Sequence, residues 1–261
     1  MLKFFEGKNV AITDRVLILG ESHYPASKEE YKEEIQDNVT SIVMEQFFNN
    51  VDNYPFFTRI ALSFGFDNHY EAVEFFNKVY FGNYIVHYAA KGNHTIGKKL
   101  IAEYQEQYND RLFNFVNEQH IKTIFCFSKN VYYGLPGNNA FDLRFDDVRI
   151  NNNEAKRART INKYIYRQGV EHAKCNVKLD NDLTVYGIAH PSGSKGCSPK
   201  EVYKYFCDNQ IINIKKIISV TISCTNANCI DNKRSLNYNN HILVIREIIY
   251  NFTNRELWEI T

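Results

Sequence analysis

Two parts of the sequence place a residue suited to acid–base chemistry directly behind a short apolar run. Glu21 begins the polar run Glu-Ser-His-Tyr at positions 21–24, which follows the apolar residues 16–20. His190 follows a second apolar run at 183–189. A carboxylate can hold a proton or stabilise a cation, and a histidine can donate a hydrogen bond to a developing anion. These residues are therefore candidates for a functional site, and an ordinary surface ion pair is the competing interpretation.

The elements that must position these residues are β-strands. Short apolar runs predict buried strands over residues 16–20, 121–127 and 183–189. A fourth strand is expected near residues 79–86 or in the last third of the chain. Helical patterns lie between the strands, so we expect a three-layer α/β/α sandwich with a mainly parallel four-stranded central sheet. In such folds the functional residues collect at the carboxyl ends of the strands.

Helices are predicted from apolar residues at helical spacing and from capping residues. Ser128 has the position of an N-cap, and Ser198-Pro-Lys-Glu201 has the pattern of a capping box with Pro at the first helical position. The predicted helices cover residues 43–51, 54–64, 69–79, 97–118 and 128–135, and another begins after residue 198.

Length and composition favour one domain. The chain has 261 residues, 44% of them hydrophobic, and no Gly-, Ser- or Pro-rich linker divides it. We expect a single domain over 1–261, with a core at about 16–205 and residues 206–261 packed on it as a C-terminal extension. Because the net charge is only +1, a polyanionic partner requires a local basic patch. Residues 150–178 interleave Lys and Arg with Tyr, which suits a nucleic-acid backbone or, equally well, a solvated helix face.

The cysteines predict free thiols. The six cysteines are scattered without a Cys-x-x-Cys pair, and Cys224 and Cys229 are too isolated from other soft ligands to indicate a metal site. The sequence shows no signal peptide and no apolar run of membrane-spanning length. We therefore expect a reducing, cytoplasmic location, no membrane contact and no metal.

Five segments, in this order, resemble motifs of the uracil-DNA glycosylase superfamily. Val16–Tyr24 resembles the first motif, a strand that ends in Gly-Glu-x-Pro-Gly or Gly-Gln-Asp-Pro-Tyr. Tyr54–Phe56 resembles the Arg-Pro-Phe segment whose Phe stacks on the flipped base, and Phe81–Val86 resembles the Thr-Asn-Val-Val segment whose Asn reads the base edge. Ile121–Leu135 resembles the strand and helix that follow, and Ala189–Ser192 matches the second catalytic motif. The order is closest to the thermophile-type branch.

The sequence also departs from that family. His23 replaces the usual Pro of the first motif, and Ser22 stands where the best-known branch has its water-activating Asp. His87-Tyr88 occupies the place of the Lys-Cys of the iron–sulfur branch, so we expect no metal cluster. Gly-Ser-Lys-Gly follows the second motif in place of an apolar wedge, so the resemblance does not fix which base is excised.

The resemblance implies a monofunctional DNA glycosylase without lyase activity. Such an enzyme hydrolyses the N-glycosidic bond of a flipped-out uracil or modified pyrimidine in DNA, leaves an abasic site, and needs no cofactor. It would act in base-excision DNA repair as a monomer. A defence glycosylase specific for a hypermodified, phage-type cytosine is the alternative within this chemistry, and a non-catalytic DNA-binding module of the same fold is the alternative outside it.

The resemblance also assigns roles to individual residues. Glu21 would position water and His190 would stabilise the departing base, while Phe56, or its neighbour Phe57, would stack on that base. Asn83 would read the Watson–Crick edge of the base, and Tyr24 would form the wall at the pyrimidine C5 position. Further candidates are Ser22 and His23 for the base pocket and Ser192, Ser194 and Lys195 for DNA phosphates.

Overall fold

The computed structural model describes residues 3–10, 15–24, 34–51, 54–88, 94–137, 148–149, 160–191 and 198–211. All of them belong to one compact unit, Met1–Ile212. A second unit, Asn213–Thr261, is outside the described residues, as is most of the extension predicted over 206–261.

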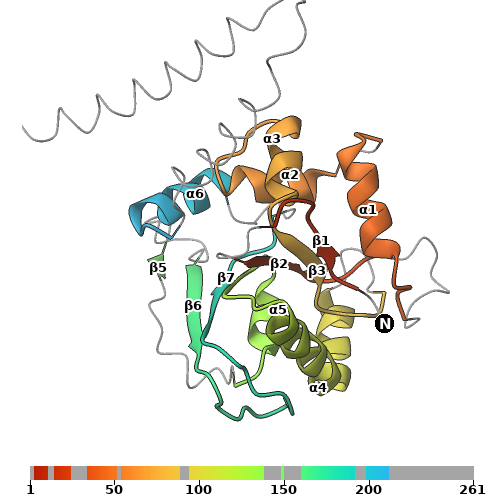
Figure 1. Ribbon diagram of the computed structural model, residues 1–261, viewed down its shortest axis with the longest axis vertical. Coiled ribbons are helices and arrows are strands. Elements are labelled where there is room, and N and C mark those ends of the chain that lie inside the picture. Colours follow the sequence, from red (N-terminus) through yellow and green to blue (C-terminus); the bar gives the residue numbers. More distant parts are fainter. Residues whose placement is uncertain are drawn as a thin grey trace, which may run out of the picture. The chain divides into compact units, whose positions relative to one another are not determined.

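One sheet of seven strands organises the described part of the chain (Figure 1). Its order is β1-β3-β2-β4-β7-β6-β5. The middle strands β3, β2, β4 and β7 run parallel, whereas β1, β6 and β5 are joined antiparallel to their neighbours. The strands are β1 (Phe5–Glu6), β2 (Val16–Gly20), β3 (Tyr80–Asn83), β4 (Thr123–Cys126), β5 (Val148–Arg149), β6 (Thr160–Tyr166) and β7 (Leu183–Gly187).

The register brings the ends of the parallel strands to one edge. Asn83 at the end of β3 pairs with Gly20 at the end of β2. Cys126 at the end of β4 pairs with Leu19 on one side and with Gly187, the end of β7, on the other. Whatever follows these four strands therefore leaves the sheet at the same edge.

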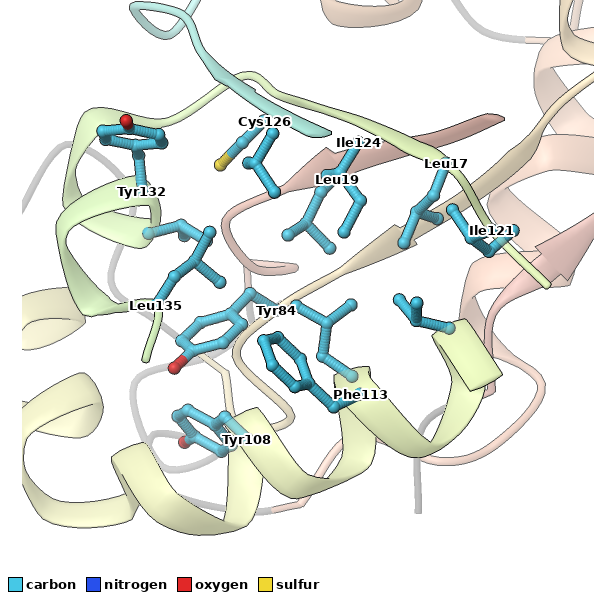
Figure 2. Close-up of a cluster of buried hydrophobic side chains, with 14 of the residues drawn as sticks. Leu17, Leu19, Tyr84, Tyr108, Phe113, Ile121, Ile124, Cys126, Tyr132 and Leu135 are labelled. Carbon is cyan, nitrogen blue, oxygen red and sulfur yellow. The ribbon is translucent and has the colours of Figure 1, made fainter. Parts of the chain in front are cut away.

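Helices cover both faces of the sheet. Successive side chains of β2 point to opposite faces, and each face packs against its own hydrophobic core. Leu17 and Leu19 face a cluster shared with α4 and α5, which Figure 2 shows with Tyr108 and Phe113 of α4. Ile18 faces a second, Phe-rich cluster shared with α1, α2, α3 and α6. The helices are α1 (Val39–Phe48), α2 (Pro55–Leu62), α3 (His69–Phe76), α4 (His94–Glu118), α5 (Lys129–Gly134) and α6 (Pro199–Asp208).

The predicted α/β class with a mainly parallel sheet is confirmed. Strands lie at all three predicted runs, and the fourth parallel strand is β3, within the predicted stretch 79–86. The sheet is wider than the four predicted strands because antiparallel strands extend it on both sides. The polar content of β6 and the two-residue length of β1 and β5 gave little apolar signal.

Four local predictions need correction. The helix-face interpretation of 150–178 is wrong over Thr160–Tyr166, which is strand β6. The helix predicted over residues 43–51 ends earlier than expected, because Val51 lies beyond α1 and is 65% exposed. The helix predicted from residue 97 begins at His94 and has a non-helical residue at Tyr104. Finally, Ser198 is the N-cap of α6, but its side chain makes no capping hydrogen bond.

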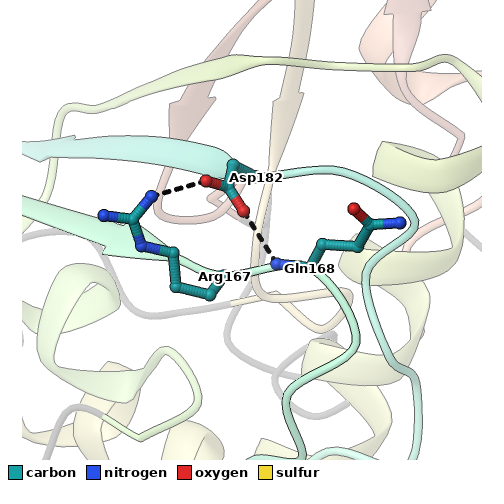
Figure 3. Close-up of polar contacts among 3 residues, drawn as sticks. All are labelled: Arg167, Gln168 and Asp182. Atoms are coloured by element: carbon teal, nitrogen blue, oxygen red, sulfur yellow. Dashed lines mark hydrogen bonds and ion pairs between the residues drawn. The ribbon is translucent and has the colours of Figure 1, made fainter.

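A surface contact joins the end of β6 to the start of β7 (Figure 3). Asp182 accepts a hydrogen bond from Arg167 Nη1 at 2.6 Å and another from the backbone N–H of Gln168 at 2.9 Å. These bonds lower the pKa of the Asp182 carboxyl, the backbone bond being the larger cause. The contact holds the turn-side end of this antiparallel pair, at the opposite edge from the candidate site.

Candidate functional site

Each of the four parallel strands places one polar residue of interest at the shared edge. Glu21 follows β2 directly, and Asn83 is the last residue of β3. Ser128 lies two residues beyond β4, and His190 lies three residues beyond β7. Because β4 separates β2 from β7, the chains at Glu21 and His190 leave the sheet about 10 Å apart, two strand spacings.

Gly20 provides the space in which two of the predicted site residues meet. A Cβ atom on Gly20 would overlap Oδ1 of Asn83 and would lie 3.4 Å from Cζ of Phe56. The amide of Asn83 and the ring of Phe56 therefore both lie over the backbone of Gly20. The structure thus brings together a flat aromatic ring and an amide, one able to stack and the other able to pair with polar atoms.

The side-chain amide of Asn83 has no hydrogen-bond partner among the described residues, although the residue is only 4% exposed. By contrast, its backbone is held firmly, because Arg111 Nη2 donates to the carbonyl of Asn83 at 2.5 Å and to that of Tyr84 at 3.1 Å. Asn83 therefore combines a fixed main chain with unused hydrogen-bonding capacity.

Arg111 reaches the strand end from α4. Its guanidinium also lies over the ring of Phe4, with Cζ 4.4 Å from the ring centroid. Burial lowers the pKa of Arg111 to about 10, so the group remains protonated at neutral pH. A permanent cation therefore anchors the two carbonyls at the end of β3.

Phe56, and not Phe57, is the aromatic residue that faces the second motif. The ring of Phe56 is partly exposed and lies 5.1 Å from the imidazole of His190 between centroids, with an interplanar angle of 30°. Phe57 is 3% exposed and packs in the core, 5.1 Å from Phe81. One turn along α2, Arg59 Nη1 donates to the carbonyl of Pro191 at 2.7 Å. Thus α2 holds the His190–Pro191 turn through both a ring contact and a hydrogen bond.

The carboxylate of Glu21 contacts the helices on the other side of the sheet. Ser128, the N-cap of α5, donates from Oγ to Glu21 Oε2 at 2.6 Å. Gly97 in α4 lies close to the other carboxylate oxygen, since a Cβ there would be 2.6 Å from Oε1. Glu21 is only partly exposed, so this carboxylate lies between two helices at the sheet edge.

The remaining residues of the first motif make separate contacts. Ser22 Oγ donates to the carbonyl of His87 at 2.7 Å. His23 Nε2 lies 3.1 Å from the hydroxyl of Thr40 on α1, and burial lowers the pKa of this imidazole to about 4, which keeps it neutral at pH 7. Tyr24 is 47% exposed; burial raises the pKa of its phenol, and the nearby charge of Glu21 raises it further.

Other predictions about the site fall outside the described residues or stay untested. Ser192, Ser194 and Lys195 lie outside the described ranges, as do residues 156–159 of the basic segment. In the described residues, no cluster of three or more His, Cys, Asp or Glu could hold a metal ion, and no helix is long and apolar enough to cross a membrane. Cys126, Cys175 and Cys207 are free thiols, and burial raises the pKa of Cys126 to about 12.

Four residues at this edge were not predicted to belong to the site. Ser128 was predicted only as an N-cap, and Gly97 only as the start of a helix. Arg59 interrupts an apolar helical stretch, and an arginine on such a face is a usable signal because it requires a buried acceptor. Arg111 follows Asn109 and Asp110 in a polar stretch and gives no such signal. Their acceptors, backbone carbonyls distant in sequence, carry no sequence signal.

Comparison of the sequence with models of known protein families and with curated proteins finds no match.

Proposed function

We propose that this protein is a monofunctional DNA glycosylase that hydrolyses the N-glycosidic bond of a flipped-out uracil or modified pyrimidine. The observation that carries the proposal is the amide of Asn83, which makes no side-chain hydrogen bond to the described residues, beside the partly exposed ring of Phe56. A planar base with polar atoms along one edge satisfies both features at once, because it stacks on the ring and pairs with the amide.

The fold supports the same proposal. The four parallel strands have the order β3-β2-β4-β7, and the five segments that resemble the uracil-DNA glycosylase superfamily lie on or directly after them, with Phe56 on α2. We assign the parallel middle of the sheet to this glycosylase-like fold. The antiparallel strands β1, β6 and β5 are additions to it.

Hydrolysis requires charge to be stabilised at two positions. As water bonds to C1′ of the deoxyribose, the bond from C1′ to the base nitrogen breaks and its electron pair leaves with the base. His190, next to the stacking ring of Phe56, would donate a hydrogen bond to the carbonyl oxygen on which that negative charge collects. Glu21 would hold the water, accept its proton and favour the cationic sugar. The products are a free base and an abasic site.

The spacing of the two groups suits these roles. Glu21 and His190 leave the same edge of the sheet about 10 Å apart, with the carboxylate of Glu21 between α4 and α5 and the imidazole of His190 beside α2. A nucleotide bound across this edge would meet Glu21 on its sugar side and His190 on its base side. Phosphate contacts would come from Ser192, Ser194 and Lys195, which follow His190 in sequence. We propose that the protein acts on DNA as a monomer, and the reaction needs no metal, cluster or cofactor.

A modified cytosine is the second candidate substrate, and Tyr24 is the observation that favours it. In a uracil-specific site this residue would form a close wall at C5 of the pyrimidine. Here Tyr24 is 47% exposed, and the half-buried His23 stands where the family has Pro. An exposed aromatic at this position leaves room for a substituent on C5, as carried by the hypermodified cytosines of phage DNA.

The decisive experiment is an excision assay on oligonucleotides that carry uracil, hydroxymethylcytosine or glucosylated hydroxymethylcytosine. Heating the products in alkali would cleave each abasic site and reveal excision. The double variant Glu21→Ala/His190→Ala, prepared identically, controls for contaminating glycosylases. Excision of uracil supports the repair function, and excision of a modified cytosine supports the defence function. Binding of all three DNAs without excision would instead identify a non-catalytic DNA-binding module.

A further inference from the structure

We infer that Ser128 and Gly97 are positioning residues that together fix the carboxylate of Glu21. The inference rests on the proposed function, in which that carboxylate holds the attacking water. Each of its two oxygens lies against a different helix: Oε2 accepts from Ser128 of the α5 N-terminus, and Oε1 lies against Gly97 of α4.

The hydroxyl of Ser128 has its orientation set by the helix that it caps. Its oxygen accepts a hydrogen bond from the backbone N–H of Val131 at 3.2 Å, as an N-cap side chain does. A hydroxyl has only one hydrogen to donate. One of its two lone pairs accepts from the helix, and its hydrogen is donated to Glu21 Oε2, 2.6 Å away. Ser128 is buried, so water does not compete for this contact.

Gly97 limits where the other carboxylate oxygen can go. A methyl group at position 97 would lie 2.6 Å from Glu21 Oε1, closer than real contacts allow. That oxygen is the end of a flexible side chain, so an added methyl would displace the carboxylate and not the backbone. Alanine is also favoured over glycine inside a helix. Gly97→Ala should therefore move the carboxylate without destabilising the fold.

Two pairs of variants test this inference on the full-length protein. Ser128→Ala removes both the cap and the donor, whereas Ser128→Thr keeps both. Asn68→Ala is the matched control, because Asn68 caps α3 through its side chain and takes no part in the site. We expect Ser128→Ala to lower kcat about 10–100-fold with KM little changed, and Ser128→Thr to restore most of kcat. Asn68→Ala should lower Tm comparably and leave kcat unchanged.

Gly97→Ala should lower kcat while Tm stays the same or rises, which a merely structural residue would not do. If both residues act through Glu21, neither substitution should lower kcat further in a Glu21→Ala background. Excision by the wild type, with kcat unchanged in Ser128→Ala and Gly97→Ala, would overturn this inference and leave the proposed function standing. Absence of excision in the wild type would overturn the proposed function. In that case, additive Tm changes for Glu21→Ala and Ser128→Ala would also overturn the contact between them.

Discussion

The aromatic ring of Phe56 lies 5.1 Å from the imidazole of His190, and the two planes are inclined by 30°. These residues are far apart in sequence, yet α2 and the turn after β7 bring them together at the edge of the sheet. The neighbouring Phe57 turns away into the core, where it is 3% exposed. Two adjacent phenylalanines thus lie in different environments, one at the candidate site and one in the core, and we expect their substitution to have different effects.

Phe56→Ala should impair excision, and Phe57→Ala should impair stability. Stacking of a base on an aromatic side chain contributes about 1–3 kcal/mol, so we expect kcat/KM of Phe56→Ala to fall about 10–100-fold with a small change in Tm. Truncating the buried Phe57 should lower the free energy of unfolding by about 3–5 kcal/mol. Steady-state excision and thermal unfolding of both variants measure this. Equal activity losses at equal stability would contradict the assignment of Phe56.

Glu21→Ala and His190→Ala should each lower excision by about 10²-fold or more, because both groups act on charge that develops in the transition state. DNA affinity should stay within a few-fold of the wild type. Single-turnover excision and fluorescence anisotropy of labelled DNA provide the two measurements. Parallel losses of affinity and rate would show instead that these residues dock the DNA or support the fold.

Asn83→Asp should change which base is excised. An amide can accept from N3–H of uracil and donate to its O4, whereas a carboxylate only accepts and suits the N4 donor of cytosine. A site built for one hydrogen-bond pattern rejects the opposite pattern strongly, because buried polar groups are then left unpaired. We expect the variant to lose uracil activity and gain some on cytosine, measured on matched oligonucleotides. Retention of full uracil activity would exclude Asn83 as the reader of the base.

Stability should fall on acidification through His23. Its pKa is about 4 in the folded protein and about 6.5 when unfolded, because burial disfavours the imidazolium. Between these values the unfolded chain binds a proton that the folded chain does not. The contribution of neutral His23 to the free energy of unfolding is therefore fully present above about pH 6.5. It is lost as the pH falls toward 4, which lowers the free energy of unfolding by roughly 2–3 kcal/mol.

The matched variant for this experiment is His23→Gln, whose amide can still contact the hydroxyl of Thr40 but does not titrate. Chemical denaturation at a series of pH values should show a shallower acid-side decline in the variant. His87 and His172 also have lowered pKa values from burial, so the difference between the two curves isolates His23. Identical curves would show that His23 is protonated in the folded state at the same pH as in the unfolded chain.

The sequence predicted those parts of the site that lie directly behind apolar runs. Glu21 and His190 were placed correctly at strand ends because a short apolar run followed by polar residues is a local signal. Asn83 was identified inside such a run, because a polar amide in an apolar strand must pair either with the backbone or with a ligand. The choice between Phe56 and Phe57 was beyond the sequence, since it depends on how α2 is rotated against the sheet.

Contacts between distant residues were not predictable. The hydrogen bond from Ser128 to Glu21 spans 107 positions in the chain, and nothing near Ser128 indicates it. The same holds for Arg111, which approaches Asn83 only because α4 packs under the end of β3. The antiparallel strand β6 was missed for another reason: the consecutive residues Asn162, Lys163 and Tyr164 separate Ile161 from Ile165, so the segment shows no period of two.

A site that takes one residue from each of four parallel strands has a consequence for how the proposed activity would be acquired. Neighbouring strands in this sheet are distant in the chain, as in the pairing of Val16 with Thr123 and of Thr123 with Thr184. Such pairings form late, because the entropy cost of closing a long loop comes before the contacts that stabilise the pairing. A refolding chain therefore gains helices and a collapsed core before it gains any catalytic arrangement. Recovery of excision during refolding should report the moment at which β7 docks on β4.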